Sequence, residues 1–136
     1  MDDRAVKALA ERLAQARLSK PAAIDYLGGS KPPQNEKDAF RVQFAMHDAL
    51  YAKGEEHGGW KVAVPLPAQY QPLGLTGPTL GGLLKSRLLK SGARFPAGSI
   101  LKHGIECEVA VRMAIDAPAS AGPYTQASIL PLIGAV

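Results

Sequence analysis

The sequence predicts an α+β fold in which two N-terminal helices precede the first strands of a β-rich core. Three observations support this prediction: two amphipathic helical segments fall before residue 57, strand-like alternation begins after Gly58, and helices and strands do not alternate strictly. The chain ends in the apolar run ILPLIGAV, whereas terminal residues are commonly polar, which predicts truncation. We therefore expect a single incomplete domain over 1–136, helical over about 1–57 and β-rich over about 58–136.

Two helices are predicted in the N-terminal part. Asp2 or Asp3 can cap the first helix, whose apolar side chains recur at helical spacing until about Ser19. The second extends from about residue 36 to residue 53, because Asn35 is a good N-cap and acidic side chains follow it. His47 lies on the apolar stripe of this helix, so we expect a histidine at the edge of the core rather than a ligand.

The segment after these helices contains the first predicted strand. Residues 60–64 alternate and are rich in β-branched side chains, which places Lys61 opposite to Trp60 and Val62. Prolines and glycines then predict a loop over 68–82, followed by a short helical or irregular piece over 83–90.

The last third of the chain contains two further predicted strands, over 98–102 and 105–114. In the longer one, Cys107, Val109 and Val111 share an apolar face, so we expect Cys107 to be an inert buried thiol. A short helix is predicted from Thr125 onward.

Composition limits the classes of function. The chain is 46% hydrophobic and 21% charged, as in ordinary soluble proteins. It lacks both a signal-peptide pattern and an apolar run of roughly 20 residues, so we expect a cytoplasmic protein that does not bind membranes. Its single cysteine excludes an internal disulfide framework and zinc sites built from several thiolates.

The net charge of +4 suits either nucleic acid or a small anionic substrate. Aromatic residues make up only 6% of the chain and no stacking motif of RNA-binding proteins is present. We therefore expect no nucleic-acid partner and interpret the basic cluster as a solvated face; its members are Lys85, Arg87, Lys90, Arg94 and Lys102.

Glu106 and Glu108 are the candidate metal ligands. They lie two residues apart on a predicted strand, so both side chains leave one face, with β-carbons separated by roughly 6 to 7 Å. Such a pair can converge on Mg²⁺, Mn²⁺ or Ca²⁺, which prefer oxygen ligands. A bare pair of this kind more often lines the solvent side of a half-buried strand, and the spacing alone does not decide between the two.

Lys61 follows two glycines and a tryptophan on a predicted strand. Its ammonium can bind a carboxylate, or it can be an ordinary surface lysine. The chain contains no nucleophile elbow, phosphate-binding P-loop or H-E-x-x-H motif, so serine hydrolases, P-loop enzymes and zincins are excluded.

Several segments, in order, resemble the 2-keto-4-pentenoate hydratase family of the fumarylacetoacetate hydrolase superfamily. They are DAFRVQFAM from Asp38, GGWKVAVPLPAQYQPLGLTGP from Gly58, SGARFPAG from Ser91, IECEVAVRMAIDAP from Ile105, and PYTQASIL from Pro123. The resemblance spans nearly all of the chain. It implies the N-terminal half of such an enzyme and the start of its mixed β core.

By this resemblance, Glu106 and Glu108 bind a divalent cation, Mg²⁺ or Mn²⁺, which acts as a Lewis acid on a substrate such as 2-hydroxypenta-2,4-dienoate. The resemblance implies a lyase that adds water to such small anionic dienoates during the breakdown of aromatic compounds. Lys61 would hold or polarise the substrate carboxylate and enol oxygen, and Leu73 would line the pocket. A homo-oligomer is expected of the full-length enzyme.

The chain departs from the family pattern at two places. Where many members have P-D-F-G, this chain has Thr79 after Pro78, so an aspartate sometimes given an acid-base role is absent. Family members are about twice as long and supply a third acidic ligand later. Asp116 matches a family turn rather than that ligand, so we expect the third ligand to be missing and this chain alone to be inactive.

Two alternatives stay open. A 2-oxo-3-hexenedioate (4-oxalocrotonate) decarboxylase resembles the same fold and metal site and differs chiefly in its reaction. A non-enzymatic remnant, or a subunit that binds a partner through exposed apolar surface, is the alternative from a different class.

Overall fold

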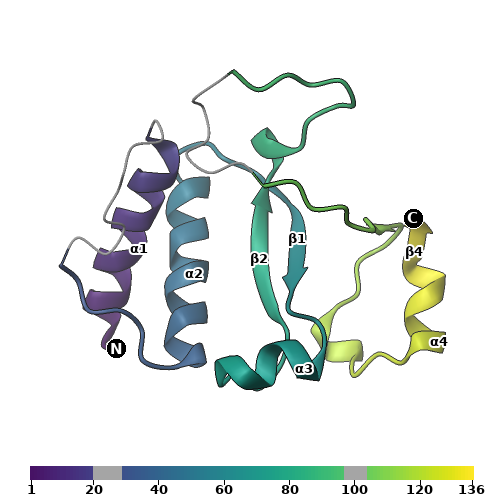
Figure 1. Cartoon of the computed structure of the whole chain (residues 1–136), viewed down its shortest axis with the longest axis horizontal. Coiled ribbons are helices and arrows are strands. Elements are labelled where there is room, and N and C mark those ends of the chain that lie inside the picture. The colour runs from purple at the N-terminus through teal and green to yellow at the C-terminus, as the bar shows by residue number, and fades with distance from the viewer. Residues whose placement is uncertain (20–28, 97–103) are drawn as a thin grey trace. The chain divides into compact units, whose positions relative to one another are not determined.

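The computed structural model describes residues 1–19, 29–96 and 104–136 (Figure 1). Contacts divide the chain into two compact units, Met1–Leu101 and Lys102–Val136. The N-terminal helices and two small antiparallel sheets make the chain α+β, which confirms the predicted class. The fumarylacetoacetate-hydrolase-like core and the division of one domain near residue 57 stay predictions.

Two capped helices begin the first unit. Helix α1 is Asp3–Leu18, and the Asp2 carboxylate accepts a hydrogen bond from the backbone N–H of Ala5. Helix α2 is Glu36–Tyr51, and the Asn35 side chain accepts from the backbone N–H of residue 38. Both predicted helices are therefore confirmed, and α2 ends two residues earlier than expected.

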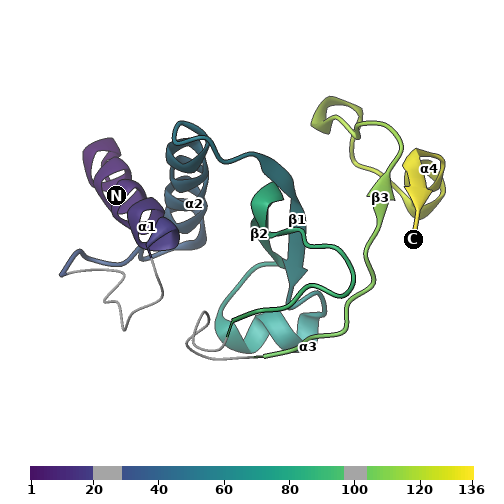
Figure 2. The same cartoon turned by 90° about the horizontal axis from the view of Figure 1, so that it is seen from above.

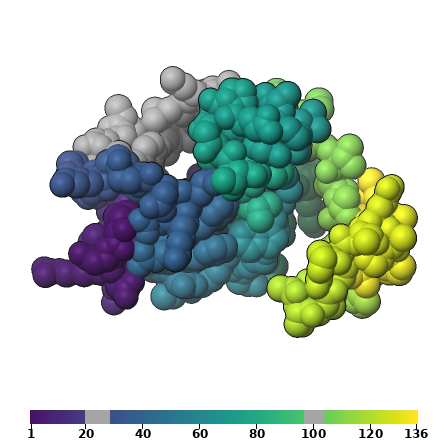
Figure 3. All heavy atoms as spheres, turned by 90° about the horizontal axis from the view of Figure 1, so that it is seen from below, coloured from purple at the N-terminus to yellow at the C-terminus, as the bar shows by residue number. Residues whose placement is uncertain are grey.

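The core of the first unit lies between α1, α2 and one strand. Two clusters of buried side chains form it, Ala14, Ala49, Leu50 and Leu84 in one and Val6, Leu9 and Val42 in the other. Figure 3 shows the atoms of α1 and α2, in purple and blue, packed against each other. The apolar stripes that predicted the helices thus face each other and exclude water.

A charged network ties the start of α1 to α2. The N-terminal ammonium lies 2.5 Å from the Asp38 carboxylate, and Arg41 lies 2.6 Å from Asp38 and 2.5 Å from Asp3. The hydrogen bond from the N-terminal ammonium, followed by that from Arg41, lowers the pKa of Asp38. Asp38 therefore stabilises the folded chain while it is ionised, and this contribution is lost as the pH falls through its lowered pKa.

An antiparallel ribbon of two strands lies beside α2 (Figure 2). Its strands are β1, His57–Ala63, and β2, Thr79–Leu84. The connection between them contains α3, Pro67–Tyr70, and the 3₁₀ turn η1, Gln71–Leu73. A second 3₁₀ turn, η2, Lys85–Arg87, follows β2. The strand predicted over 60–64 is confirmed, whereas the loop predicted over 68–82 is wrong where it includes α3, η1 and most of β2.

The second unit has a smaller sheet. Strands β3, Arg112–Met113, and β4, Ile133–Ala135, pair antiparallel. Between them lie η3, Ala119–Ala121, α4, Gln126–Ile129, and η4, Leu130–Leu132. Thr125 caps α4 through a bond from the backbone N–H of Ser128, which confirms the predicted short helix.

The long strand predicted over 105–114 is wrong in most of its length. Only Arg112–Met113 pairs, while residues 104–111 are exposed and without a ladder. Alternating apolar and polar side chains form a strand only where a neighbouring strand accepts and donates the backbone hydrogen bonds. Here β4 pairs with just these two residues. The strand predicted over 98–102 lies outside the described residues.

Across the parts of the chain that the structure describes, every helix is too short or too polar to cross a membrane.

Candidate active site

Lys61 lies near the centre of the β1–β2 ribbon. The register pairs Lys61 with Gly81, Trp60 with Gly82, and residue 63 with Thr79. Because successive side chains of a strand leave opposite faces, Lys61 lies on the other face from Trp60, as the sequence predicted.

The face of the ribbon that carries Trp60 packs on α2. Leu84 joins the buried cluster of the helices, and a β-carbon added at Gly82 would lie 2.4 Å from Cε1 of His47. A hydrogen bond also joins α2 to β2: the side-chain Nε2 of Gln43 donates to the carbonyl of Leu80 at 2.9 Å. These contacts place α2 against this face and orient Lys61 away from the helix.

The opposite face, which we call the Lys61 face, carries Gly59, Lys61, Ala63, Thr79, Gly81 and Leu83. All six residues are partly exposed. No described atom comes within 4 Å of a β-carbon built at Gly59 or Gly81. A side chain placed at either glycine would therefore meet none of the described atoms.

Leu73, the predicted pocket residue, ends the turn η1 in the connection between the strands. Gly74 follows it with a φ of 71°, a left-handed conformation that glycine adopts without strain. Glu36 of α2 anchors this connection by accepting from the backbone N–H of Thr76 at 3.2 Å and from its hydroxyl at 2.8 Å. Leu73 itself is 64% exposed, and its role in substrate binding stays a prediction.

Glu106 and Glu108 lie in the exposed, unpaired segment before β3. We expected a paired strand that directs both carboxylates to one face of a sheet, and these described positions form no such strand. That Glu106 and Glu108 bind one cation together stays a prediction. Each of the two residues makes an interaction within the chain. Among the described residues, no group of three histidine, cysteine or acidic side chains is arranged to hold a metal.

Cys107, between the two glutamates, is exposed. The prediction of a buried thiol is therefore wrong, for the same reason as the strand: the expected apolar face stays exposed and is not covered by the residues that the structure describes. Val109, on that face, is 80% exposed.

His47 is only 5% exposed, as expected for a histidine at the core edge, and two less buried polar side chains, Tyr51 and His57, lie beside it. The Tyr51 hydroxyl lies 3.3 Å from Nδ1 of His47 and 3.1 Å from Nδ1 of His57. A hydroxyl has one proton to donate, so Tyr51 donates to one imidazole and accepts from the other. The sequence predicted the position of His47 but not its neighbour His57, because His57 belongs to β1 and comes close to α2 only in the folded chain.

We expect the folded chain to lose stability on mild acidification because of His47. Burial lowers the pKa of His47, the charges of His57 and Arg17 lower it further, and Asp48 opposes them. In the unfolded chain the imidazole takes up a proton near pH 6.5, whereas in the folded chain it stays neutral to lower pH. The free energy of unfolding therefore falls as the pH falls below about 6.5.

The measurement is urea unfolding at about pH 7.5 and about pH 5.5, for the wild type and His47→Gln. Glutamine keeps a polar side chain at this position but does not titrate. The loss of stability should be smaller in His47→Gln than in the wild type, and an equal loss would show that other groups cause it.

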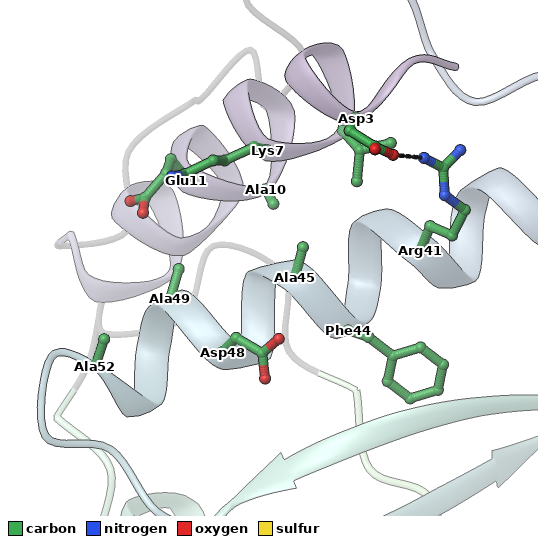
Figure 4. A pocket seen from close by; sticks show the side chains of 11 residues that line it. Asp3, Lys7, Ala10, Glu11, Arg41, Phe44, Ala45, Asp48, Ala49 and Ala52 are labelled. Atoms are coloured by element: carbon green, nitrogen blue, oxygen red, sulfur yellow. Dashed lines mark hydrogen bonds and ion pairs between the residues drawn. The ribbon is translucent and has the colours of Figure 1, made fainter.

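A groove of about 630 Å³ lies between α1 and α2, away from the Lys61 face. Figure 4 shows Ala10 and Ala45 on the facing sides of the helices, and the ion pair of Asp3 with Arg41 at one end. Small side chains here leave space between the helices. None of the predicted site residues lines this groove.

Comparison with known proteins tests the resemblance. The chain is 28% identical over 134 residues to a 2-keto-4-pentenoate hydratase of Paraburkholderia phymatum, covering 98% of this chain and 49% of that protein. It is 28% identical over 110 residues to a protein of the same name from Burkholderia vietnamiensis, covering 81% of this chain and 42% of that protein. The chain is similar to 2-keto-4-pentenoate hydratases. This confirms the resemblance drawn from the motifs.

The chain spans about half the length of these hydratases. No family model matches it, and no solved structure matches it. The donor chemistry of Glu106 and Glu108 fits the hard cation expected for a hydratase of this kind, because both side chains offer carboxylate oxygens. In number the donors fall short of a complete site, since the described residues contain no arranged group of three ligands.

Proposed function

We propose that this chain contributes part of the active site of a metal-dependent hydratase, a lyase that adds water to 2-hydroxypenta-2,4-dienoate-type substrates in the breakdown of aromatic compounds. The observation that carries the proposal is the similarity to two hydratases, in one case over 98% of the chain. A region equivalent to the rest of those proteins would complete the site, and the complete enzyme is proposed to be a homo-oligomer.

Lys61 is proposed to bind the carboxylate and enol oxygen of the substrate. Its position near the centre of a strand supports this role, because a strand fixes the root of the side chain and an ammonium binds carboxylate oxygens. An ammonium beside these oxygens favours the form of the substrate in which negative charge develops on them. Leu73 would supply apolar contact to the carbon chain.

Glu106 and Glu108 are proposed to hold Mg²⁺ or Mn²⁺. When bound, such a cation supplies Lewis-acid stabilisation of negative charge on the substrate oxygens. The role of the two glutamates is to fix the cation with negatively charged oxygens, which hard divalent ions prefer over nitrogen or sulfur.

A hydration assay tests the proposed function. Protein expressed from the whole reading frame that contains this sequence is incubated with Mg²⁺ and 2-hydroxypenta-2,4-dienoate, and loss of the conjugated diene is followed by ultraviolet absorbance. Hydration that stops when a chelator is added is the expected result. Release of carbon dioxide from 2-oxo-3-hexenedioate, without hydration of the dienoate, would instead indicate the decarboxylase.

We expect the Glu106→Gln/Glu108→Gln variant to bind Mn²⁺ roughly tenfold more weakly than the wild type, because two charged ligands become neutral amides. Titration calorimetry or the Mn²⁺ electron paramagnetic resonance signal measures the affinity. Asp116→Asn, which removes an exposed carboxylate from the same unit, is the matched control and should leave the affinity unchanged. Equal affinity in the double variant and the wild type would reject these ligands.

A partner-binding subunit is the second candidate function, favoured by exposed apolar side chains on α2 and the ribbon. Phe44 is 48% exposed and Trp60 49% exposed, and their ring centroids are 6.2 Å apart. Exposed aromatic clusters of this kind are common at protein interfaces. A concentration-dependent change of mass in sedimentation, abolished by Trp60→Ser in a chain that hydrates no dienoate, would support this function over the enzyme.

A further inference from the structure

The hydroxyl of Tyr51 joins two imidazoles that come from different elements. His47 and Tyr51 lie one turn apart on α2, and His57 is the first residue of β1. The hydroxyl lies 3.3 Å from Nδ1 of His47 and 3.1 Å from Nδ1 of His57. We call these three side chains the histidine clasp, because they join the beginning of β1 to the end of α2.

The hydrogen bonds of the histidine clasp require at least one neutral imidazole. A neutral imidazole can leave Nδ1 bare to accept the Tyr51 proton, whereas an imidazolium carries a proton on both nitrogens. If His57 alone is protonated, it donates to the hydroxyl, and the hydroxyl still donates to His47. If both imidazoles are protonated, two N–H groups point at one hydroxyl, the Tyr51 proton has lost its acceptor, and two positive charges repel each other.

His47 is the imidazole that stays neutral longest as the solution becomes acid. Burial lowers its pKa, the charges of His57 on β1 and Arg17 on α1 lower it further, and Asp48 on α2 opposes them. β2 meets His47 at Gly82, which does not titrate. The hydrogen bonds of the clasp are therefore present above about pH 6.5 and are lost only when the pH falls through the lowered pKa of His47.

His57 is the part of the clasp that can move. Its side chain is exposed, whereas that of His47 is buried. The strand register shifts between His57 and Gly59, so the pairing from Gly59 onward is separated from the first residue of β1 by an irregularity. Gly59 has a φ of 147°, which residues with side chains rarely adopt. Glu56, the acidic neighbour of His57, is paired with Lys85 at 2.7 Å.

We propose that the histidine clasp is a pH-sensitive switch: protonation of both imidazoles opens it, and the His57 side chain leaves Tyr51 while the ribbon stays packed on α2. The hydrogen bond from Gln43 to Leu80 and the contact of Phe44 with Trp60 lie outside the clasp and keep the ribbon in place. This inference does not depend on the proposed function, because it uses none of the residues proposed for the active site.

Nuclear Overhauser cross-peaks in NMR spectra of the whole 136-residue chain test the switch. Cross-peaks between the rings of Tyr51 and His57 report the closed clasp. Cross-peaks between Phe44 and Trp60, whose ring centroids are 6.2 Å apart, report the packing of the ribbon on α2. We expect the first set at about pH 7.5 and its loss at about pH 4.5, with the second set kept at both pH values. Persistence of the first set at about pH 4.5, or loss of both sets together, would overturn the inference.

Two variants test whether His47 and the hydroxyl control the clasp. His47→Gln keeps a polar side chain but cannot be protonated, so the cross-peaks between Tyr51 and His57 should remain at about pH 4.5. Tyr51→Phe keeps the ring but removes the hydroxyl, so its cross-peaks with His57 should be weak already at about pH 7.5. Tyr124→Phe is the matched control, because it removes a hydroxyl that donates to the carbonyl of Pro118 in the second unit, and it should behave as the wild type.

Either variant can reject the switch without the other. Cross-peaks lost in His47→Gln to the same extent as in the wild type would show that His47 does not control the clasp. Cross-peaks with His57 as strong in Tyr51→Phe as in the wild type at about pH 7.5 would show that the hydroxyl does not hold it.

Discussion

Leu50→Ala is expected to lower the free energy of unfolding by about 2 to 5 kcal/mol, the usual cost of removing a buried leucine side chain and leaving a cavity. Leu50 is 1% exposed and packs with Ala14, Ala49 and Leu84. It therefore contacts α1 and β2 from α2. Losing this contact weakens both the helix pair and the attachment of the ribbon that carries Lys61.

Urea unfolding monitored by circular dichroism measures the effect. Leu89→Ala is the matched control, because Leu89 is 53% exposed and its truncation should change stability by less than about 0.5 kcal/mol. A Leu50→Ala chain as stable as the Leu89→Ala chain would show that α2 does not pack on α1 and β2 as described.

Gly82→Ala is expected to destabilise the chain by about 1 to 3 kcal/mol, the usual cost of overpacking a core. The added β-carbon would lie 2.4 Å from Cε1 and 2.5 Å from Nε2 of His47, so the buried imidazole has to move. Movement of His47 also disturbs its hydrogen bond with Tyr51. The contact of α2 with the ribbon thus requires a residue without a side chain at this position.

Gly81→Ala gives the control, one residue away on the opposite face. Its β-carbon meets no described atom within 4 Å, so it should be neutral, or stabilising by about 0.5 kcal/mol because glycine is unfavourable within strands. In a double-mutant cycle, His47→Ala should relieve part of the cost of Gly82→Ala. Equal stability of the Gly81→Ala and Gly82→Ala chains would contradict the proposed orientation of the ribbon.

These two variants also bear on function. The packing that buries Leu84 and places His47 against Gly82 decides that the face opposite to Lys61 turns toward α2. If the ribbon were turned over, Lys61 would face α2. Stability at these positions and the role proposed for Lys61 therefore depend on one arrangement.

The sequence by itself determined the two helices and the placing of Lys61 on the opposite strand face from Trp60 and Val62. Asp2 and Asn35 cap the helices through bonds to backbone within three residues, and such local bonds need no tertiary partner. The alternation of Trp60, Lys61 and Val62 depends only on the period of a strand. The resemblance to the hydratases likewise followed from the order of short motifs.

Only the tertiary structure decided where β2 lies and which residues share the face of Lys61. Glycines favour loops in isolation, and β2 exists because β1 supplies hydrogen bonds to a segment that contains Gly81 and Gly82. The same dependence on a partner explains why the strand predicted over 105–114 shrinks to Arg112–Met113. Strand pairing joins segments distant in sequence, so its register is a property of the folded chain and not of local pattern.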